Sequence, residues 1–71
     1  MENQLRITLA AARVNAGLTQ EEACKVLHFT KNTLVNWEKY ATQPKVEQAE
    51  KLSQLYKIPY QNLLFVAPKT N

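Results

Sequence analysis

Apolar residues recur at helical spacing along most of this chain, and their pattern predicts an all-α fold. One apolar stripe of the first helix is formed by Leu5, Leu9, Ala12 and Ala16. The five expected helices have the approximate bounds Asn3–Ala16, Gln20–Leu27, Lys31–Lys39, Val46–Tyr56 and Pro59–Leu64. Gly17 ends the first helix, because glycine adopts the left-handed conformation without steric strain. No strand alternation or internal repeat interrupts this pattern.

The start signals of the second and third helices are the clearest in the chain. Thr19 can cap the second helix, and Glu22, three residues later, completes a capping box. Thr30 can cap the third helix, because its hydroxyl can accept an orphan N–H of the first turn. The short segment Leu27–Phe29 between them leaves room only for a sharp turn. The sequence therefore predicts two short helices joined by a tight break.

The third predicted helix has two different faces. Leu34 and Trp37 lie on an apolar face, where the single tryptophan suits the centre of a small core. The opposite face carries Lys31, Asn32, Val35 and Asn36. The second helix buries Ala23, Cys24 and Leu27, and the fourth turns Val46, Ala49, Leu52 and Tyr56 inward. A helix-turn-helix that reads DNA needs this division between a core face and a polar face.

Composition narrows the function classes. The 71 residues suit one domain, which we place at residues 1–65 with a tail at 66–71, and leave little room for an enclosed substrate pocket. The net charge of +3 suits a polyanionic partner but is modest. No nucleophile–base pair, phosphate-binding loop or metal-ligand spacing is present, so we expect no enzyme activity, cofactor or metal. The lone Cys24 excludes an internal disulfide, and neither a membrane span nor a signal pattern is seen.

These motifs together resemble the phage-repressor and Cro-type helix-turn-helix family, a five-helix, lambda-repressor-like DNA-binding domain. The resemblance runs from about Leu5 to Leu64. It rests on five segments: Leu18–Glu22, Thr30–Leu34, Trp37–Glu38, Pro44 and Ile58–Leu64. It implies a regulator of transcription that binds palindromic operator DNA, as a two-fold dimer in most of the family, and that works in the bacterial cytoplasm at the nucleoid.

The resemblance also implies roles for single residues. The DNA-contacting positions would be Gln20, Lys31, Asn32, Thr33, Val35, Asn36, Tyr40, Thr42 and Gln43. Gln20 corresponds to a glutamine that contacts a backbone phosphate. Asparagine can bond adenine through two atoms and lysine can reach guanine, whereas Val35 offers only apolar contact. Arg13 and Glu38 match positions that form a largely buried ion pair, which would fix orientation more than it adds stability.

Three positions depart from the family pattern, because His28, Tyr40 and Lys57 stand where the family has glycine. Histidine tolerates positive φ better than most residues, so the geometry of these turns is left open by the sequence. The loop after the third helix also lacks the family's arginine and lysine residues. Phosphate binding should therefore be moderate, or should depend on a dimer.

The sequence leaves alternatives for the dimer contact and for the type of regulator. Phe65 and Val66 are the candidates for a weak symmetric dimer contact; alternatively, Phe65 folds back on its own core. The leading identity is a Cro-like phage or prophage repressor without a small-molecule effector or a membrane partner. An antitoxin-like autoregulator is the second reading, and a protein-interaction module that reuses the fold is the third.

Overall fold

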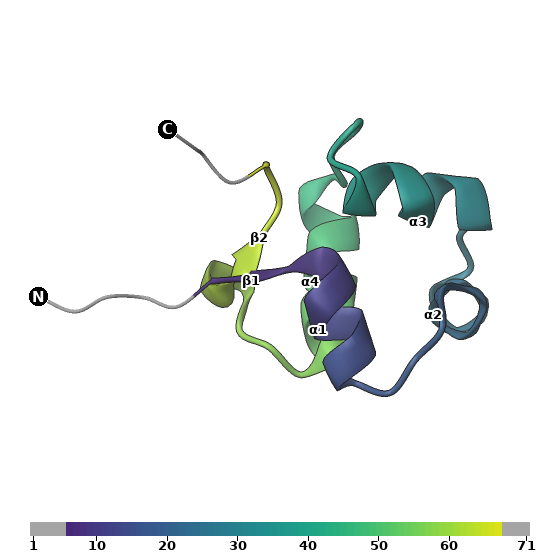
Figure 1. The fold of residues 1–71 in the computed structure, drawn as a ribbon, viewed down its shortest axis with the longest axis horizontal. Coiled ribbons are helices and arrows are strands. Elements are labelled where there is room, and N and C mark those ends of the chain that lie inside the picture. The colour runs from purple at the N-terminus through teal and green to yellow at the C-terminus, as the bar shows by residue number, and fades with distance from the viewer. Residues whose placement is uncertain (1–5, 68–71) are drawn as a thin grey trace, which may run out of the picture.

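The computed structural model describes residues 6–67, which hold four α-helices, one 3-10 turn and two short strands (Figure 1). In chain order the elements are β1 (Ile7–Thr8), α1 (Leu9–Asn15), α2 (Gln20–Leu27), α3 (Lys31–Glu38), α4 (Val46–Tyr56), the 3-10 turn (Tyr60–Asn62) and β2 (Leu63–Leu64). Figure 1 shows α2 and α3 towards one end of the long axis and both strands towards the other, with α1 and α4 between them.

Three threonines set where the first three helices begin. The Thr19 hydroxyl accepts the Glu22 N–H at 3.1 Å, and the Glu22 carboxylate accepts the Thr19 N–H at 2.9 Å. The predicted capping box is therefore confirmed. Thr30 caps α3 by accepting the Thr33 N–H at 3.2 Å, also as predicted. Thr8 caps α1 in the same way through the Ala11 N–H.

The core lies where α1, α3 and α4 meet. Leu9, Leu34 and Leu52, one from each of these helices, have no exposed surface. Trp37 is 3% exposed and meets the Phe29 ring edge to face, with centroids 5.0 Å apart. The prediction that Trp37 belongs to the core is confirmed, and so is the inward face predicted for the second helix.

The first helix is shorter than predicted. It begins at Leu9, whereas Asn3 and Leu5 lie outside the described residues. Thr8 is the N-cap of the helix. Its backbone is extended and its side chain accepts the Ala11 N–H, so the helix cannot begin earlier. Ile7 and Thr8 then pair in parallel with Leu63 and Leu64. Both are β-branched, which favours the strand over the helix.

The prediction of a fifth helix was wrong for the described residues. The segment after Pro59 makes a single 3-10 turn, closed by the Asn62 N–H on the Pro59 carbonyl at 2.8 Å. Leu63 is then extended, because it pairs with Ile7 of β1, and its side chain is buried in the core. The expectation of no strand fails for the same reason. What stands is a mostly helical domain with a two-stranded sheet.

Two residues expected on inward faces are exposed. Val46 is 64% exposed, because it opens α4 one turn before the first buried residue of that helix, Ala49. Ala16 lies past the last turn of α1 and is exposed as well. The helical spacing was right, but the core ends before either helix does.

The turns at family glycine positions keep a left-handed backbone without glycine. His28, Tyr40 and Lys57 have φ values of 62°, 63° and 58°, and Gly17 has 76°. His28 and Lys57 end α2 and α4 and donate their N–H groups to Cys24 and Ser53. The geometry left open by the sequence is thus retained, at a conformational cost of about 1 kcal/mol or more for each non-glycine residue.

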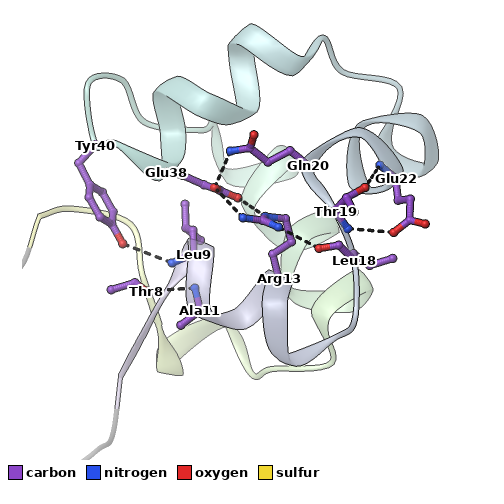
Figure 2. A network of polar contacts seen from close by, with 10 residues as sticks. All are labelled: Thr8, Leu9, Ala11, Arg13, Leu18, Thr19, Gln20, Glu22, Glu38 and Tyr40. Atoms are coloured by element: carbon purple, nitrogen blue, oxygen red, sulfur yellow. Dashed lines mark hydrogen bonds and ion pairs between the residues drawn. The ribbon is translucent and has the colours of Figure 1, made fainter.

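Arg13 and Glu38 join α1 to the end of α3 (Figure 2). The Arg13 Nε donates to Glu38 Oε2 at 2.7 Å, and its Nη2 donates to Oε1 at 3.3 Å. The third guanidinium nitrogen, Nη1, donates to the Leu18 carbonyl at 2.9 Å. The two side chains are only 14% and 7% exposed. The hydrogen bond to Glu38 raises the pKa of Arg13 above its ordinary value, so the guanidinium stays ionised.

Breaking this pair on one side should destabilise the fold. We expect Arg13→Ala to lower the free energy of unfolding by about 3 kcal/mol, because Glu38 loses its ionic partner at a site that water barely reaches. Urea unfolding followed by Trp37 fluorescence measures this change. In a double-mutant cycle with Glu38→Ala the pair should couple strongly. The exposed pair Lys31–Glu21, at 3.6 Å, is the matched control and should couple by about 0–1 kcal/mol. Equal coupling in both cycles would contradict this role.

Tyr56 should make the protein sensitive to alkali. Its hydroxyl is buried without a hydrogen-bond partner among the described residues, and this burial raises its pKa to about 12. An unfolded tyrosine ionises near pH 10. The stabilising contribution is therefore complete below about pH 10 and is lost as the pH rises towards about 12, by at most about 1.4 kcal/mol per pH unit.

Tyr56→Phe tests this expectation by removing only the hydroxyl. At pH 7 the variant should be as stable as the native chain or slightly more stable, because no hydrogen bond is lost. Between pH 10 and pH 12 it should lose less stability than the native chain, as measured by urea unfolding at each pH. Tyr60→Phe, which changes an exposed ring, is the control. Parallel pH curves for Tyr56→Phe and the native chain would refute the expectation.

Candidate nucleic-acid interface

The outward face of α3 carries the side chains that the sequence assigned to DNA. Lys31 and Asn32 are exposed, and Thr33, Val35 and Asn36 are half-buried. The inward face holds Leu34 and Trp37, which are 0% and 3% exposed. The helix is therefore anchored by its apolar face, and its polar face is presented to the surroundings.

Two asparagines on this face have unused hydrogen-bonding groups. Within residues 6–67 the side-chain amides of Asn32 and Asn36 make no hydrogen bond. An amide offers a carbonyl acceptor and an N–H₂ donor side by side, the pair of groups that matches the adenine edge in the major groove. Thr33 differs, since its hydroxyl lies 2.9 Å from the Thr30 hydroxyl. These asparagines are the chemically most specific groups of the face.

Lys31 has a weak partner in the free protein. Its Nζ lies 3.6 Å from Glu21 Oε2, and the two side chains are 55% and 75% exposed. An ion pair this exposed contributes about 0–1 kcal/mol, so it can be exchanged for a nucleic-acid contact at little cost. Glu21 also places a negative charge close to this face, which moderates its attraction for phosphate.

Gln20 is held by the ion pair that joins α1 to α3. Its Nε2 donates to Glu38 Oε1 at 3.0 Å, on the same oxygen that receives Arg13 Nη2 (Figure 2). The amide nitrogen carries two N–H groups, so one remains for another acceptor. Gln20 is also the first residue of α2, where helix N–H groups favour an anion. The network thus fixes the direction in which the glutamine points.

The loop after α3 is folded back on the helix end. The N–H groups of Ala41 and Thr42 donate to the Asn36 carbonyl at 2.9 and 3.4 Å. Thr42 and Gln43 are exposed beyond this turn. Both therefore remain available for contacts with a partner on the α3 side.

Tyr40 does not fit the DNA-contacting set as its sequence position suggested. Its hydroxyl donates to the Leu64 carbonyl at 3.0 Å and accepts the Leu9 N–H at 3.3 Å. Its ring packs against the core. The phenol is thus used inside the fold, and we remove its side chain from the candidate contacts. A large aromatic residue in a glycine position was the signal for this internal role, which sequence reasoning missed.

The remaining sequence candidates lie elsewhere. Cys24 is 7% exposed, and burial raises the pKa of its thiol, which disfavours the reactive thiolate. Within residues 6–67 no three His, Cys, Asp or Glu side chains gather closely enough to hold a metal ion. In the same stretch no helix has both the length and the apolar character to cross a bilayer.

The two dimer candidates lie at the sheet end of the molecule. Phe65 is half-buried against the core and stacks at a tilt on Tyr60, with ring centroids 5.0 Å apart. Val66 is 51% exposed. Beside them is an open hollow of about 300 Å³ lined by Arg6, Tyr60, Gln61, Leu63, Leu64, Phe65 and Val66. Phe65 therefore packs partly against the core of its own chain, whereas Val66 does not.

Comparison with known proteins agrees with this geometry. A family profile described as helix-turn-helix matches residues 9–63, from the start of α1 to β2. The chain is also similar to the cryptic phage CTXphi transcriptional repressor RstR of Vibrio cholerae, with 38% identity over 52 residues. That similarity covers 73% of this chain and 47% of the relative, so the chain spans about half the length of the curated relative it matches.

No solved structure gives a significant match. The family profile covers most of the chain, including both helices of the motif and the turn between them. The chain therefore belongs to the helix-turn-helix family, of the phage-repressor type that its sequence resembles.

Proposed function

We propose that this protein is a transcriptional regulator that binds double-stranded DNA by placing α3 in the major groove. The observation that carries the proposal is the outward face of α3, where Asn32 and Asn36 keep their amides free while Leu34 and Trp37 hold the helix on the core. A helix supported in this way is already ordered before it meets base edges, so binding costs little backbone conformational entropy.

The contacts divide by chemistry. Asn32 and Asn36 read adenine edges, Lys31 reaches a guanine, and Val35 touches a thymine methyl. The phosphate contacts come from Gln20, Thr33, Thr42 and Gln43. Gln20 keeps one amide N–H for this purpose while the other is bound to Glu38. Neutral donors thus supply most of the positioning, which agrees with the modest net charge of +3.

Repression at a phage or prophage operator is the form of regulation that we propose. The similarity to the repressor RstR supports it. A regulator of this kind works in the cytoplasm, at the nucleoid.

Self-association is the second part of the proposal. One recognition helix reads only a few base pairs, so two copies on a palindrome provide the specificity that one lacks. The apolar segment Phe65–Val66, beside the open hollow at the sheet end, is the proposed contact. The patch is small, so the dimer is weak in solution and forms fully on the operator.

DNA titration at two salt concentrations tests the proposal. Binding to a selected duplex should weaken as salt rises, because this positively charged domain displaces counterions from the phosphates that it approaches. Gln20→Ala should weaken specific and random DNA alike, whereas Gln54→Ala on α4 serves as the control. Binding that is absent at low salt would refute the DNA-binding proposal and favour a module that holds a protein partner.

Asn36→Ala should relax specificity at a single base pair. We expect a loss of about 1–3 kcal/mol in binding to the selected site, because a contact through two hydrogen bonds is removed. Random DNA should be bound almost as before. Asn15→Ala, an exposed asparagine at the end of α1, is the matched control. An equal loss on specific and random DNA would show that Asn36 contacts phosphate or nothing at all.

Phe65→Ser should weaken cooperative binding to a palindrome while the protein stays folded. The change removes apolar surface from the proposed contact, so two protomers should bind less cooperatively. Sedimentation with a palindromic duplex whose half-site centres are about 34 Å apart measures the stoichiometry. Val14→Ser, at a site that is 63% exposed on α1, is the control. One protomer per palindrome at saturation would refute the dimer.

A further inference from the structure

Tyr40 differs from the other residues that hold a left-handed backbone. His28 and Lys57 share its positive φ, but their side chains are exposed. The Tyr40 side chain is half-buried and packs against the core. A non-glycine residue in this conformation is strained unless its surroundings hold it there, so contacts of the side chain must compensate.

The compensating contacts come from the phenol. The hydroxyl accepts the Leu9 N–H at 3.3 Å and donates to the Leu64 carbonyl at 3.0 Å. Figure 2 shows the ring of Tyr40 directed away from α3 and towards the first turn of α1. Leu9 opens α1, so its N–H has no partner within the helix. One hydroxyl therefore joins the turn after α3, the start of α1 and the end of β2.

The hydrogen-bonded bridge through the Tyr40 side chain joins two segments that have different roles in the proposed function. On the backbone side, Tyr40 leads directly into Ala41 and Thr42, whose N–H groups bond the Asn36 carbonyl of α3. On the side-chain side, Leu64 is followed at once by Phe65 and Val66. The Tyr40 ring therefore connects the turn after α3 with the segment that precedes Phe65.

We propose that Tyr40 is a positioning residue that sets the place of the segment Phe65–Val66 relative to the recognition helix. The hydroxyl holds the Leu64 carbonyl, and the left-handed turn after α3 sets the direction of the ring towards α1. In a dimer joined through this segment, the same bridge determines the distance between the two recognition helices. This consequence rests on the proposed function, whereas the positioning itself does not.

Amide hydrogen exchange of the free protein tests the positioning without DNA. Tyr40→Phe keeps the ring and the backbone strain but removes both hydrogen bonds. The Leu9 amide should then exchange at least tenfold faster relative to the amides of α2, which report the stability of the whole domain. Tyr56→Phe is the matched control, because it removes a buried hydroxyl that has no partner among residues 6–67. Unchanged relative exchange at Leu9 would overturn the proposal.

DNA binding tests the consequence. The native chain should prefer one spacing in a series of palindromes whose half-sites are moved by one base pair at a time. Tyr40→Phe should flatten this preference at least fivefold, while its affinity for an isolated half-site stays within twofold of the native value. Tyr40→Gly relieves the strained backbone and also deletes the bridge. It should flatten the preference as well. Because it also removes the ring from the core, urea unfolding is used first to show that both variants are folded.

The outcomes separate this inference from the proposed function. Equal losses on half-sites and palindromes would mean that Tyr40 acts through the DNA-contacting loop, which overturns the positioning role. A retained spacing preference in both variants would overturn it too. If the native chain has no spacing preference, the proposed dimer fails. Faster exchange at Leu9 in Tyr40→Phe would still support the bridge from Tyr40 to the start of α1 within the monomer.

Discussion

The junction of Arg13, Glu38 and Gln20 is the constraint on which the rest of the structure depends. One carboxylate receives donors from α1 and α2 while it sits at the end of α3. The pair is too well shielded from water to tolerate the loss of one charge, yet desolvation offsets much of its attraction. The main effect of the pair is on orientation. It fixes the orientation of α3 relative to α1 and the direction of the Gln20 side chain.

The outward face of α3 can be polar because the apolar side chains of its inward face are buried in the core. Leu34 and Trp37 give up all or nearly all of their surface, so the helix needs no apolar contact on the other side. The weak, exposed pairing of Lys31 with Glu21 leaves that lysine exchangeable. A surface of this kind is stable while empty and still holds its donors and acceptors ready for a partner.

The tyrosine at position 40 gives this member of the family contacts that glycine could not make. Glycine at position 40 would form the same turn with less strain but would carry no side chain. Tyrosine is strained in this conformation, but its hydroxyl makes two hydrogen bonds to distant parts of the chain. The turn after the recognition helix is therefore tied to the start of α1 and to β2, and a local backbone feature acquires a structural role across the domain.

The sequence by itself determined the features that depend on neighbours in the chain. The capping box at Thr19, the cap at Thr30 and the helical spacing of α2 to α4 need only local chemistry. Tertiary structure alone decided what distant segments do to one another. Ile7–Thr8 became a strand because Leu63–Leu64 pairs with it, and this pairing took the place of the helix expected at both of these segments. The Tyr40 hydroxyl likewise found its partners 31 and 24 residues away, where no local pattern could reveal them.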